Sequence, residues 1–201
     1  MKLLIASNNM HKFKELSPSL ERLGFHCFTP DQLNIRLPQE VECYDSYQDN
    51  ARSKVQALLH APVDAILGDD SGLEVMALGN QPGLHSARYA GTGKEEDNRA
   101  FLLQQLHGIP FSDRQARFIC LLCLWFQHQF YFFEGCVDGY ILEQEVGTNG
   151  FGYDPLFYLP SLQKTFSQIS QEQKFQLSHR GRAMEKCICF LTEKINTEGG
   201  S

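Results

Sequence analysis

The sequence has no apolar run long enough to cross a bilayer. A membrane-spanning helix needs about 20 consecutive apolar residues, and a secretion signal has an apolar core of about 7–15. The first residues, "MKLLIAS", contain only a short apolar stretch before the polar "SNNMHK". We therefore expect a protein that neither enters a membrane nor is secreted, and that works in the cytoplasm.

An excess of basic residues is also missing. The chain has 18 Lys and Arg against 24 Asp and Glu, for a formal net charge of -6. Proteins whose main partner is a nucleic-acid polymer usually carry a basic face, so we expect no such partner. A small phosphorylated ligand is still compatible with this composition, because a local pocket with a few cations is enough to bind it.

The seven cysteines lack the regular spacing of a disulfide framework, and their number is odd. This is typical of a reducing compartment. Cys120 and Cys123 form a CxxC, but they lie inside the apolar run "FICLLCLWF". We expect them to be core residues of a buried strand and not metal ligands, because a zinc site would need a second pair of ligands.

The hydrophobic pattern alternates between strands and helices along 201 residues. "KLLIA" predicts a strand, "HKFKELSPSLERLG" and "SYQDNARSKVQALLHA" predict helices, and "VDAILGDDSGLEVMAL" predicts two strands that meet at a Ser-Gly turn. Residues 117–142 predict an antiparallel meander, and residues 170–195 a helix interrupted near Gly181. The pattern indicates an α/β or α+β fold with a mixed sheet.

The turn "ASNNMHK" joins the first predicted strand to the first predicted helix. The free N–H groups and the dipole at a helix start attract phosphate, and Ser7, Asn8, Asn9 and Lys12 add side-chain donors. Ser and Asn are also ordinary helix caps. The sequence leaves both interpretations open.

Two adjacent carboxylates, Asp69 and Asp70, stand in "AILGDDSGLEV". A turn at the strand end would direct both toward one cleft, where a Mg²⁺ ion would offset their repulsion. Alternatively they are solvated turn residues. Glu40 and Glu42 are further oxygen donors, or solvated loop charges.

Two more segments carry groups suited to a nucleotide. In "GTNGFGYDP", residues 147–155, the glycines allow close approach of a planar ligand, and Phe151 or Tyr153 could stack on a base; a tight turn explains the glycines equally well. In "KFQLSHRGRA", Lys174, His179 and Arg180 are donors for carbonyl or phosphate oxygens, or they form an ordinary helix surface.

The segments "SNNMHKFKE", "DDSGLEVMALGNQPGLHSARYAG", "GFGYDPLF" and "SHRGRA" occur in one order along nearly the whole chain. In this they resemble the inosine triphosphate pyrophosphatase family, the Ham1-like enzymes. The resemblance implies an α/β fold with an elongated mixed sheet flanked by helices, forming a single domain over residues 1–201 with two lobes and a central nucleotide cleft. It also implies a homodimer, and Mg²⁺-dependent hydrolysis of ITP, dITP or XTP to the monophosphate and pyrophosphate.

The resemblance also implies roles for individual residues. Asp70 would be the general base and a metal ligand, Asp69 would support it, and Glu42 would help to hold Mg²⁺. Phe151 would stack on the purine, Asp154 would lie at its edge, and Gly152 and Tyr153 belong to the same binding motif. The triphosphate would be held by Ser7, Asn8, Asn9, Met10, His11, Lys12, Lys54 and Ser71, and the pocket would be closed by Lys174, His179 and Arg180.

Two alternatives remain at this point. A Maf-like pyrophosphatase of modified pyrimidine nucleotides would also use a metal and a nucleotide cleft, but the complete "SHRG" and "GFGYD" motifs favour the purine enzyme. A nucleotide-binding regulator without turnover would be expected to have lost Asp70 or Lys12, and both are present.

Overall fold

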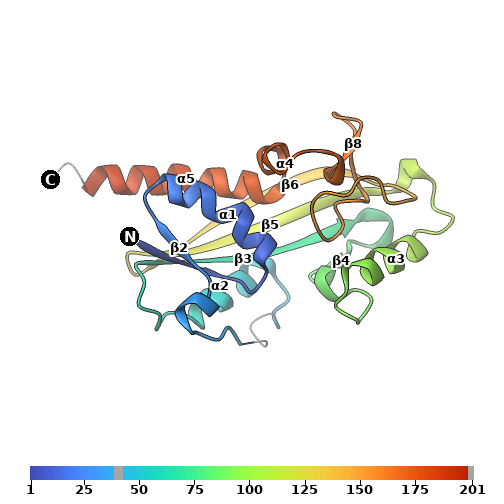
Figure 1. Ribbon diagram of the computed structural model, residues 1–201. Coiled ribbons are helices and arrows are strands. Elements are labelled where there is room, and N and C mark those ends of the chain that lie inside the picture. Colours follow the sequence, from blue (N-terminus) through green and yellow to red (C-terminus); the bar gives the residue numbers. More distant parts are fainter. Residues whose placement is uncertain (39–42, 199–201) are drawn as a thin grey trace. The chain divides into compact units, whose positions relative to one another are not determined.

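The computed structural model describes residues 1–38 and 43–198 and has a mixed sheet with helices beside it (Figure 1). The sheet order is β2-β1-β3-β5-β6-β7-β8, with β4 paired to β3. The fold class predicted from the sequence, an α/β fold with a mixed sheet flanked by helices, is confirmed. The strands are β1 Lys2–Ala6, β2 His26–Phe28, β3 Ala65–Val75, β4 Gln81–Gly83, β5 Gln115–Phe126, β6 Gln129–Ile141, β7 Phe157–Leu159 and β8 Lys164–Thr165. The helices are α1 Met10–Arg22, α2 Tyr47–Gln56, α3 Glu95–Gln105, α4 Gln171–Leu177 and α5 His179–Glu198.

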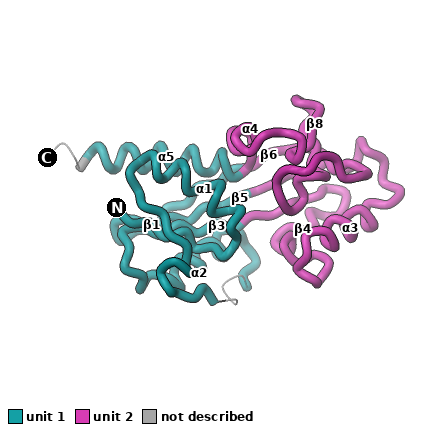
Figure 2. The backbone as a smooth tube through the Cα atoms, viewed as in Figure 1, with its two compact units in different colours: residues 1–70, 120–135, 180–201 teal, residues 71–119, 136–179 magenta. Residues whose placement is uncertain are grey.

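The chain divides into two compact units, which are coloured separately in Figure 2. Unit 1 contains residues 1–70, 120–135 and 180–201, and unit 2 contains residues 71–119 and 136–179. The strands β3, β5 and β6 each contribute residues to both units. The two units are described separately below.

In unit 1, the strand β1 pairs in parallel with both β2 and β3. Alternate residues of β1 face opposite sides of the sheet, so Leu4 and Ala6 pack in one core cluster with Ala51 and Val55 of α2. Figure 1 shows α2 on one side of these strands and α1 and α5 on the other. Gly68 of β3 allows α2 to approach closely, because a Cβ there would lie 2.5 Å from the backbone oxygen of Ala51.

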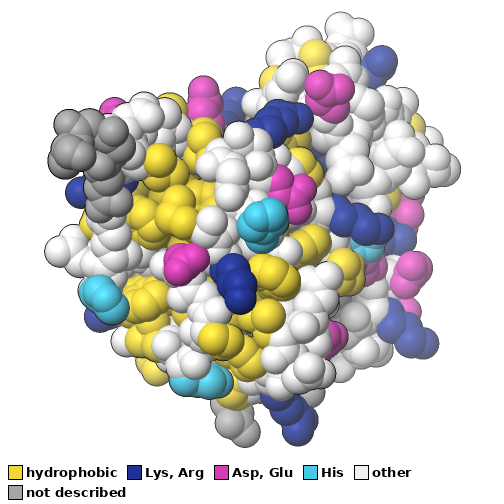
Figure 3. Space-filling view, turned by 60° about the vertical axis from the view of Figure 1, so that its left-hand side comes forward, with side chains coloured by type: hydrophobic (Ala, Val, Ile, Leu, Met, Phe, Trp, Pro, Cys, Tyr) yellow, Lys and Arg dark blue, Asp and Glu magenta, His cyan; other side chains and the backbone are white. Residues whose placement is uncertain are grey.

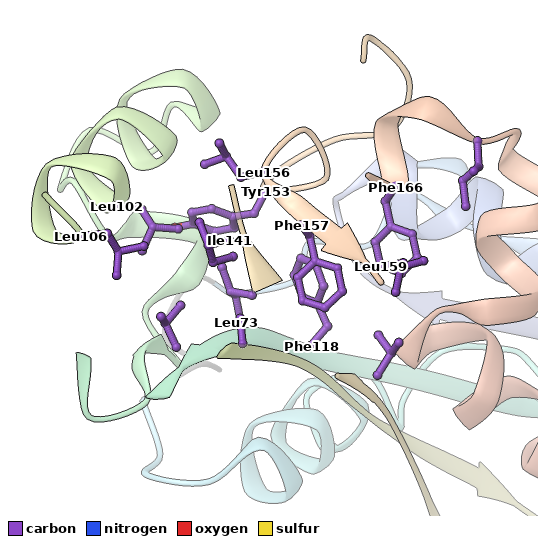
Figure 4. Close-up of a cluster of buried hydrophobic side chains, with 14 residues drawn as sticks. Leu73, Leu102, Leu106, Phe118, Ile141, Tyr153, Leu156, Phe157, Leu159 and Phe166 are labelled. Carbon is purple, nitrogen blue, oxygen red and sulfur yellow. The ribbon is translucent and has the colours of Figure 1, made fainter. Parts of the chain in front are cut away.

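In unit 2, the core is rich in aromatic side chains (Figure 4). The ring centroids of Phe118 and Phe157 are 4.6 Å apart, and those of Phe157 and Phe166 are 5.2 Å apart. Leu102 and Leu106 of α3 belong to the same buried cluster. The strand β7 pairs antiparallel with β6 and with β8.

Three local predictions need correction. Residues 65–75 form one continuous strand, β3, and not two strands that meet at Ser71 and Gly72. The C-terminal helical region is interrupted at Ser178, between α4 and α5, and not at Gly181. The glycine-rich segment "GNQPGLHSARYAGTGKEED", residues 79–97, is predicted from the sequence as a loop, but it contains the short strand β4 and the start of α3.

The placement of the CxxC cysteines is confirmed, since Cys120 and Cys123 are both fully buried on β5. No helix among the described residues is long and apolar enough to span a membrane. On the face drawn in Figure 3, basic and acidic side chains are interspersed with hydrophobic ones.

Candidate functional site

Asp69 and Asp70 lie in the middle of the continuous strand β3. Successive side chains of a strand point to opposite faces of the sheet. The prediction that a turn directs both carboxylates into one cleft is therefore wrong. Each carboxylate instead has its own set of partners, supplied by different helices of unit 1.

Asp69 is held by two cations in the interior of unit 1. Its side chain is 0% exposed and forms ion pairs with Lys12 of α1 and, at 2.7 Å, with Nε of Arg180 of α5. Burial alone would raise the pKa of the Asp69 carboxyl, but the charges of Arg180 and Lys12 hold that pKa well below its usual range. Asp69 is thus a permanently charged carboxylate, and its pairing leaves it poorly suited to exchange a proton.

The thiol of Cys120 is a further partner of Asp69. Its Sγ donates to Oδ2 of Asp69 at 3.2 Å. Burial, and then the negative charge of Asp69, raise the pKa of this thiol well above its usual value. Cys120 therefore stays protonated and acts as a hydrogen-bond donor.

Arg180 connects Asp69 to a third carboxylate, Glu15 of α1. The Arg180 side chain is 2% exposed, and its Nη1 lies 2.6 Å from Oε2 of Glu15. Sequence reasoning did not identify Glu15. A signal was available, because Glu15 follows Lys12 by three residues and so lies on the same face of the predicted helix.

Asp70 is bound by two residues of α2. Nζ of Lys54 lies 2.7 Å from Oδ1 of Asp70, and Nδ2 of Asn50 donates to Oδ2 at 3.3 Å. Lys54 also donates to the backbone oxygen of Asp69 at 2.8 Å. Asn50 was not predicted, although it precedes Lys54 by one helical turn. The Asp70 side chain is 10% exposed, compared with 0% for Asp69, so Asp70 is the more accessible carboxylate of the two.

We call Lys12, Lys54, Arg180, Glu15, Asp69 and Asp70 the charged cluster. It joins three cations to three carboxylates through ion pairs within unit 1. Buried charges are costly unless they are paired and hydrogen-bonded, and here the formal charges balance. A polyphosphate that approached this cluster would therefore meet little net positive charge from these six side chains.

The turn before α1 has a capping role. Oδ1 of Asn9 accepts hydrogen bonds from the backbone N–H of His11 at 2.8 Å and of Lys12 at 3.4 Å. The capping interpretation is therefore correct for Asn9. Asn8, Met10 and His11 are exposed, and Ser7 is half-buried.

In unit 2, a second group of predicted residues meets around the 147–155 loop. Oδ2 of Asp154 accepts from the backbone N–H of Phe151 at 2.9 Å and lies 2.6 Å from Nζ of Lys174. The same ammonium lies 4.3 Å from the centre of the Phe151 ring. Phe151 is half-buried, while Asp154 and Lys174 are buried. The loop therefore presents one partly accessible aromatic ring backed by a buried ion pair.

Two other predicted residues are part of the core of unit 2. The Tyr153 side chain is buried in the aromatic cluster (Figure 4), and its hydroxyl donates to the backbone oxygen of Ser86 at 2.9 Å. His179 is buried and stacks on Phe118, with ring centroids 4.7 Å apart. Of the two aromatic residues considered for stacking on a base, the structure leaves Phe151 as the accessible one. The remaining predicted residue, Ser71, is half-buried on β3.

The glycines of the 147–155 loop are explained mainly by the packing of the protein itself. A Cβ at Gly147 would lie 2.5 Å from the backbone of Ser167, and one at Gly150 would overlap Oδ2 of Asp154. Both residues have a positive φ, a conformation that glycine adopts without strain. The tight-turn interpretation therefore accounts for these two positions.

Replacing Gly150 with alanine is expected to destabilise the 147–155 loop, because the new Cβ would displace the Asp154 carboxylate. Gly93→Ala is the matched control: Gly93 also has a positive φ, of 73°, but open space where a Cβ would lie. Both variants carry a backbone strain of about 1–2 kcal/mol. We expect Gly150→Ala to have the lower Tm in thermal unfolding. Equal effects in the two variants would contradict the packing argument.

The oxygen donors of the charged cluster fit a hard divalent cation. Mg²⁺ is commonly held by one or two carboxylates together with substrate phosphates and water, and Asp70 is the less buried of the two adjacent aspartates. Within residues 1–38 and 43–198, no group of three or more His, Cys, Asp or Glu side chains has the arrangement of a metal site. Glu42, predicted to help hold Mg²⁺, and Glu40 lie outside the described residues.

Comparison with known proteins agrees with the sequence motifs. The sequence model of the Ham1 family matches residues 3–190. A dITP/XTP pyrophosphatase of Leuconostoc mesenteroides is 41% identical over 92% of this chain and 94% of its own length, and one of Thermus thermophilus is 39% identical over 94% and 90%. The solved structure of the Staphylococcus aureus Ham1 protein superposes with a TM-score of 0.84 at 36% identity, covering 96% of this chain and all of that one.

Proposed function

This chain belongs to the Ham1 family, and we propose that it hydrolyses non-standard purine nucleoside triphosphates such as ITP, dITP and XTP to the monophosphate and pyrophosphate. It is an enzyme, a nucleoside triphosphate pyrophosphatase among the hydrolases that act on acid anhydrides. The observation that carries the proposal is the match, over nearly full length, to relatives named dITP/XTP pyrophosphatases. The charged cluster supplies the chemical groups that this reaction needs.

The two adjacent aspartates have different roles in this reaction. Asp70 is the general base that takes a proton from the attacking water, since its carboxylate is the less buried of the two. Asp69 stays charged and positions Lys12 and Arg180. Lys12 and Lys54 stabilise the negative charge that grows on the pyrophosphate leaving group. The turn from Ser7 to Lys12, together with Ser71, contributes donors to the phosphates.

The balanced charge of the cluster supports a divalent cation as part of the substrate complex. A triphosphate carries several negative charges, whereas the six side chains of the cluster sum to none. We infer that Mg²⁺ accompanies the nucleotide and that Asp70 and Glu42 hold it. When bound, the ion would supply positive charge to the phosphate oxygens and make nearby water more acidic. Removing divalent cations with EDTA should therefore stop turnover.

In unit 2, the 147–155 loop is assigned to the base. Phe151 stacks on the purine, while Gly152, Tyr153, Asp154, Lys174 and His179 shape the pocket around it. Hypoxanthine and xanthine carry a carbonyl at position six, where adenine carries an amino group. A pocket that offers hydrogen-bond donors at this position leaves the amino group of adenine without an acceptor. Such a site can discriminate between ITP and ATP by several orders of magnitude.

The proposal also covers the biological role, the location and the partners of the enzyme. By removing non-standard nucleotides, it would prevent their incorporation into DNA and RNA. We place it in the cytoplasm, as a homodimer, with no nucleic-acid polymer or membrane among its partners. Sedimentation of the purified protein tests the dimer directly.

The test of the activity is a Mg²⁺-dependent assay on ITP, XTP, GTP and ATP that identifies the products as well as the rates. We expect the monophosphate and pyrophosphate from ITP or XTP, and little product from ATP. Hydrolysis of modified pyrimidine triphosphates alone would favour the Maf-like alternative. Binding of ITP without any product would favour the non-catalytic regulator.

A further inference from the structure

Helix α3 holds the backbone of the 147–155 loop at Gly152. Oε2 of Glu95 accepts a hydrogen bond from the backbone N–H of Gly152 at 2.7 Å. Nη1 of Arg99 donates to the backbone oxygen of the same glycine at 3.0 Å. Glu95 and Arg99 are one helical turn apart and lie within 4.0 Å of each other. The side chains of Glu95 and Arg99 therefore bind both the backbone N–H and the backbone oxygen of Gly152.

Arg99 is a largely buried arginine next to the 147–155 loop. Its side chain is only 11% exposed, and its Nε lies 2.9 Å from Oε1 of Glu145, which precedes the loop. Burying a guanidinium group is costly unless it is well paired. Here its hydrogen bond to Gly152 and its ion pair with Glu145 connect α3 to two points of the chain around the loop.

The contacts of Glu95 and Arg99 are made at Gly152, the residue that follows Phe151. Phe151 precedes Gly152, and its own N–H is bound by Asp154 at 2.9 Å. Gly152 has a φ of 60° and open space around its Cβ position, so neighbouring side chains do not restrict it sterically. The conformation of this glycine is instead fixed by Glu95 and Arg99. The backbone on both sides of the Phe151 ring is thus held by hydrogen bonds.

We propose that Glu95 and Arg99 are positioning residues that hold the Phe151–Asp154 segment in the conformation that receives the base, and so sharpen the preference for oxopurines over adenine. The inference rests on the proposed function and adds residues that do not touch the substrate. A binding loop ordered in advance loses less entropy on binding, and discrimination between similar bases depends on donors held at fixed positions.

The kinetic test compares Arg99→Met and Glu95→Ala with wild type, on ITP and ATP. We expect the KM for ITP to rise about 3- to 10-fold, kcat to change less than about 2-fold, and the ratio of kcat/KM for ITP over ATP to fall. Glu95→Gln keeps an oxygen that accepts from Gly152, so this variant should stay close to wild type. The controls are Glu96→Gln, an exposed residue of the same helical turn, and Arg117→Met, a surface arginine paired with Asp138.

A second measurement does not depend on activity. Hydrogen exchange of the segment around Gly152, without nucleotide, should be faster by about 10-fold or more in Arg99→Met and Glu95→Ala than in the controls. Unchanged exchange, or an unchanged ITP-to-ATP ratio accompanied by a fall in Tm and kcat, would overturn the proposal. If wild type hydrolyses neither ITP nor XTP, the proposed function fails, and the exchange data still decide whether the two side chains hold the loop.

Discussion

Asp70→Asn is expected to lower the rate of ITP hydrolysis by about 10²- to 10⁴-fold, the usual contribution of a general base, while nucleotide binding is largely kept. Asparagine retains an oxygen that can accept from Lys54, which lies 2.7 Å from Oδ1 of Asp70, but it cannot take a proton from water. Steady-state rates and a binding titration with ITP would separate the two effects.

The matched control is Asp138→Asn, the same change on β6 at a side chain that is 71% exposed. We expect this control to match wild type in rate and in Tm. If Asp70→Asn hydrolysed ITP normally, Asp70 would not be the base. If the hydrolysis rate, the nucleotide binding and the Tm of Asp70→Asn all fell together, the main role of Asp70 would be to pair with Lys54.

Arg180→Met is expected to reduce the free energy of unfolding by about 3–5 kcal/mol, as found when one partner of a buried ion pair is removed. Methionine fills much of the space but leaves Asp69 and Glu15 without the guanidinium that lies 2.7 Å and 2.6 Å from them. Urea denaturation at neutral pH would measure the loss. Adding Asp69→Asn and Glu15→Gln to this variant should restore part of the stability, because it removes the two buried negative charges that the guanidinium balances.

The control for Arg180→Met is Arg117→Met, which removes an arginine from a surface ion pair, where such pairs contribute about 0–1 kcal/mol. The family resemblance assigns Arg180 to the closing of the nucleotide pocket, a role in which its loss would blur the base preference more than it slows the reaction. A variant that kept its stability but changed its ITP-to-ATP ratio would favour that earlier hypothesis. A large fall in stability would favour the pairing with Asp69.

The elements around the site could be predicted because their signals are local. The apolar spacing of residues 11–24 and 46–61 anticipated α1 and α2, and the alternation of strands and helices anticipated the α/β fold. The motifs also indicated the residues that make the ion pairs of both units, among them Lys12, Lys54 and Lys174. Each of these inferences depends on neighbours within a few positions along the chain.

The site geometry could not be predicted in the same way. The Ser-Gly pair after Asp70 suggested a turn, but strand pairing carries β3 through it, so Asp69 and Asp70 face opposite sides. Glu15 and Asn50 were missed for a related reason. A polar residue on a helix has no local feature that distinguishes a buried partner from a solvated one, and its role depends on what packs against that face.

By itself, the sequence determined the fold class, the family resemblance and the identity of most charged groups, because motifs and periodicity are properties of adjacent residues. Only the tertiary structure decided which charges pair. Arg180 reaches Asp69 across 111 positions of the chain and Glu15 across 165. Such partners are chosen by the folding of strands and helices into one core, where each buried charge must find an opposite one. That requirement separates two adjacent aspartates into one that is fully enclosed and one that keeps a small exposed fraction.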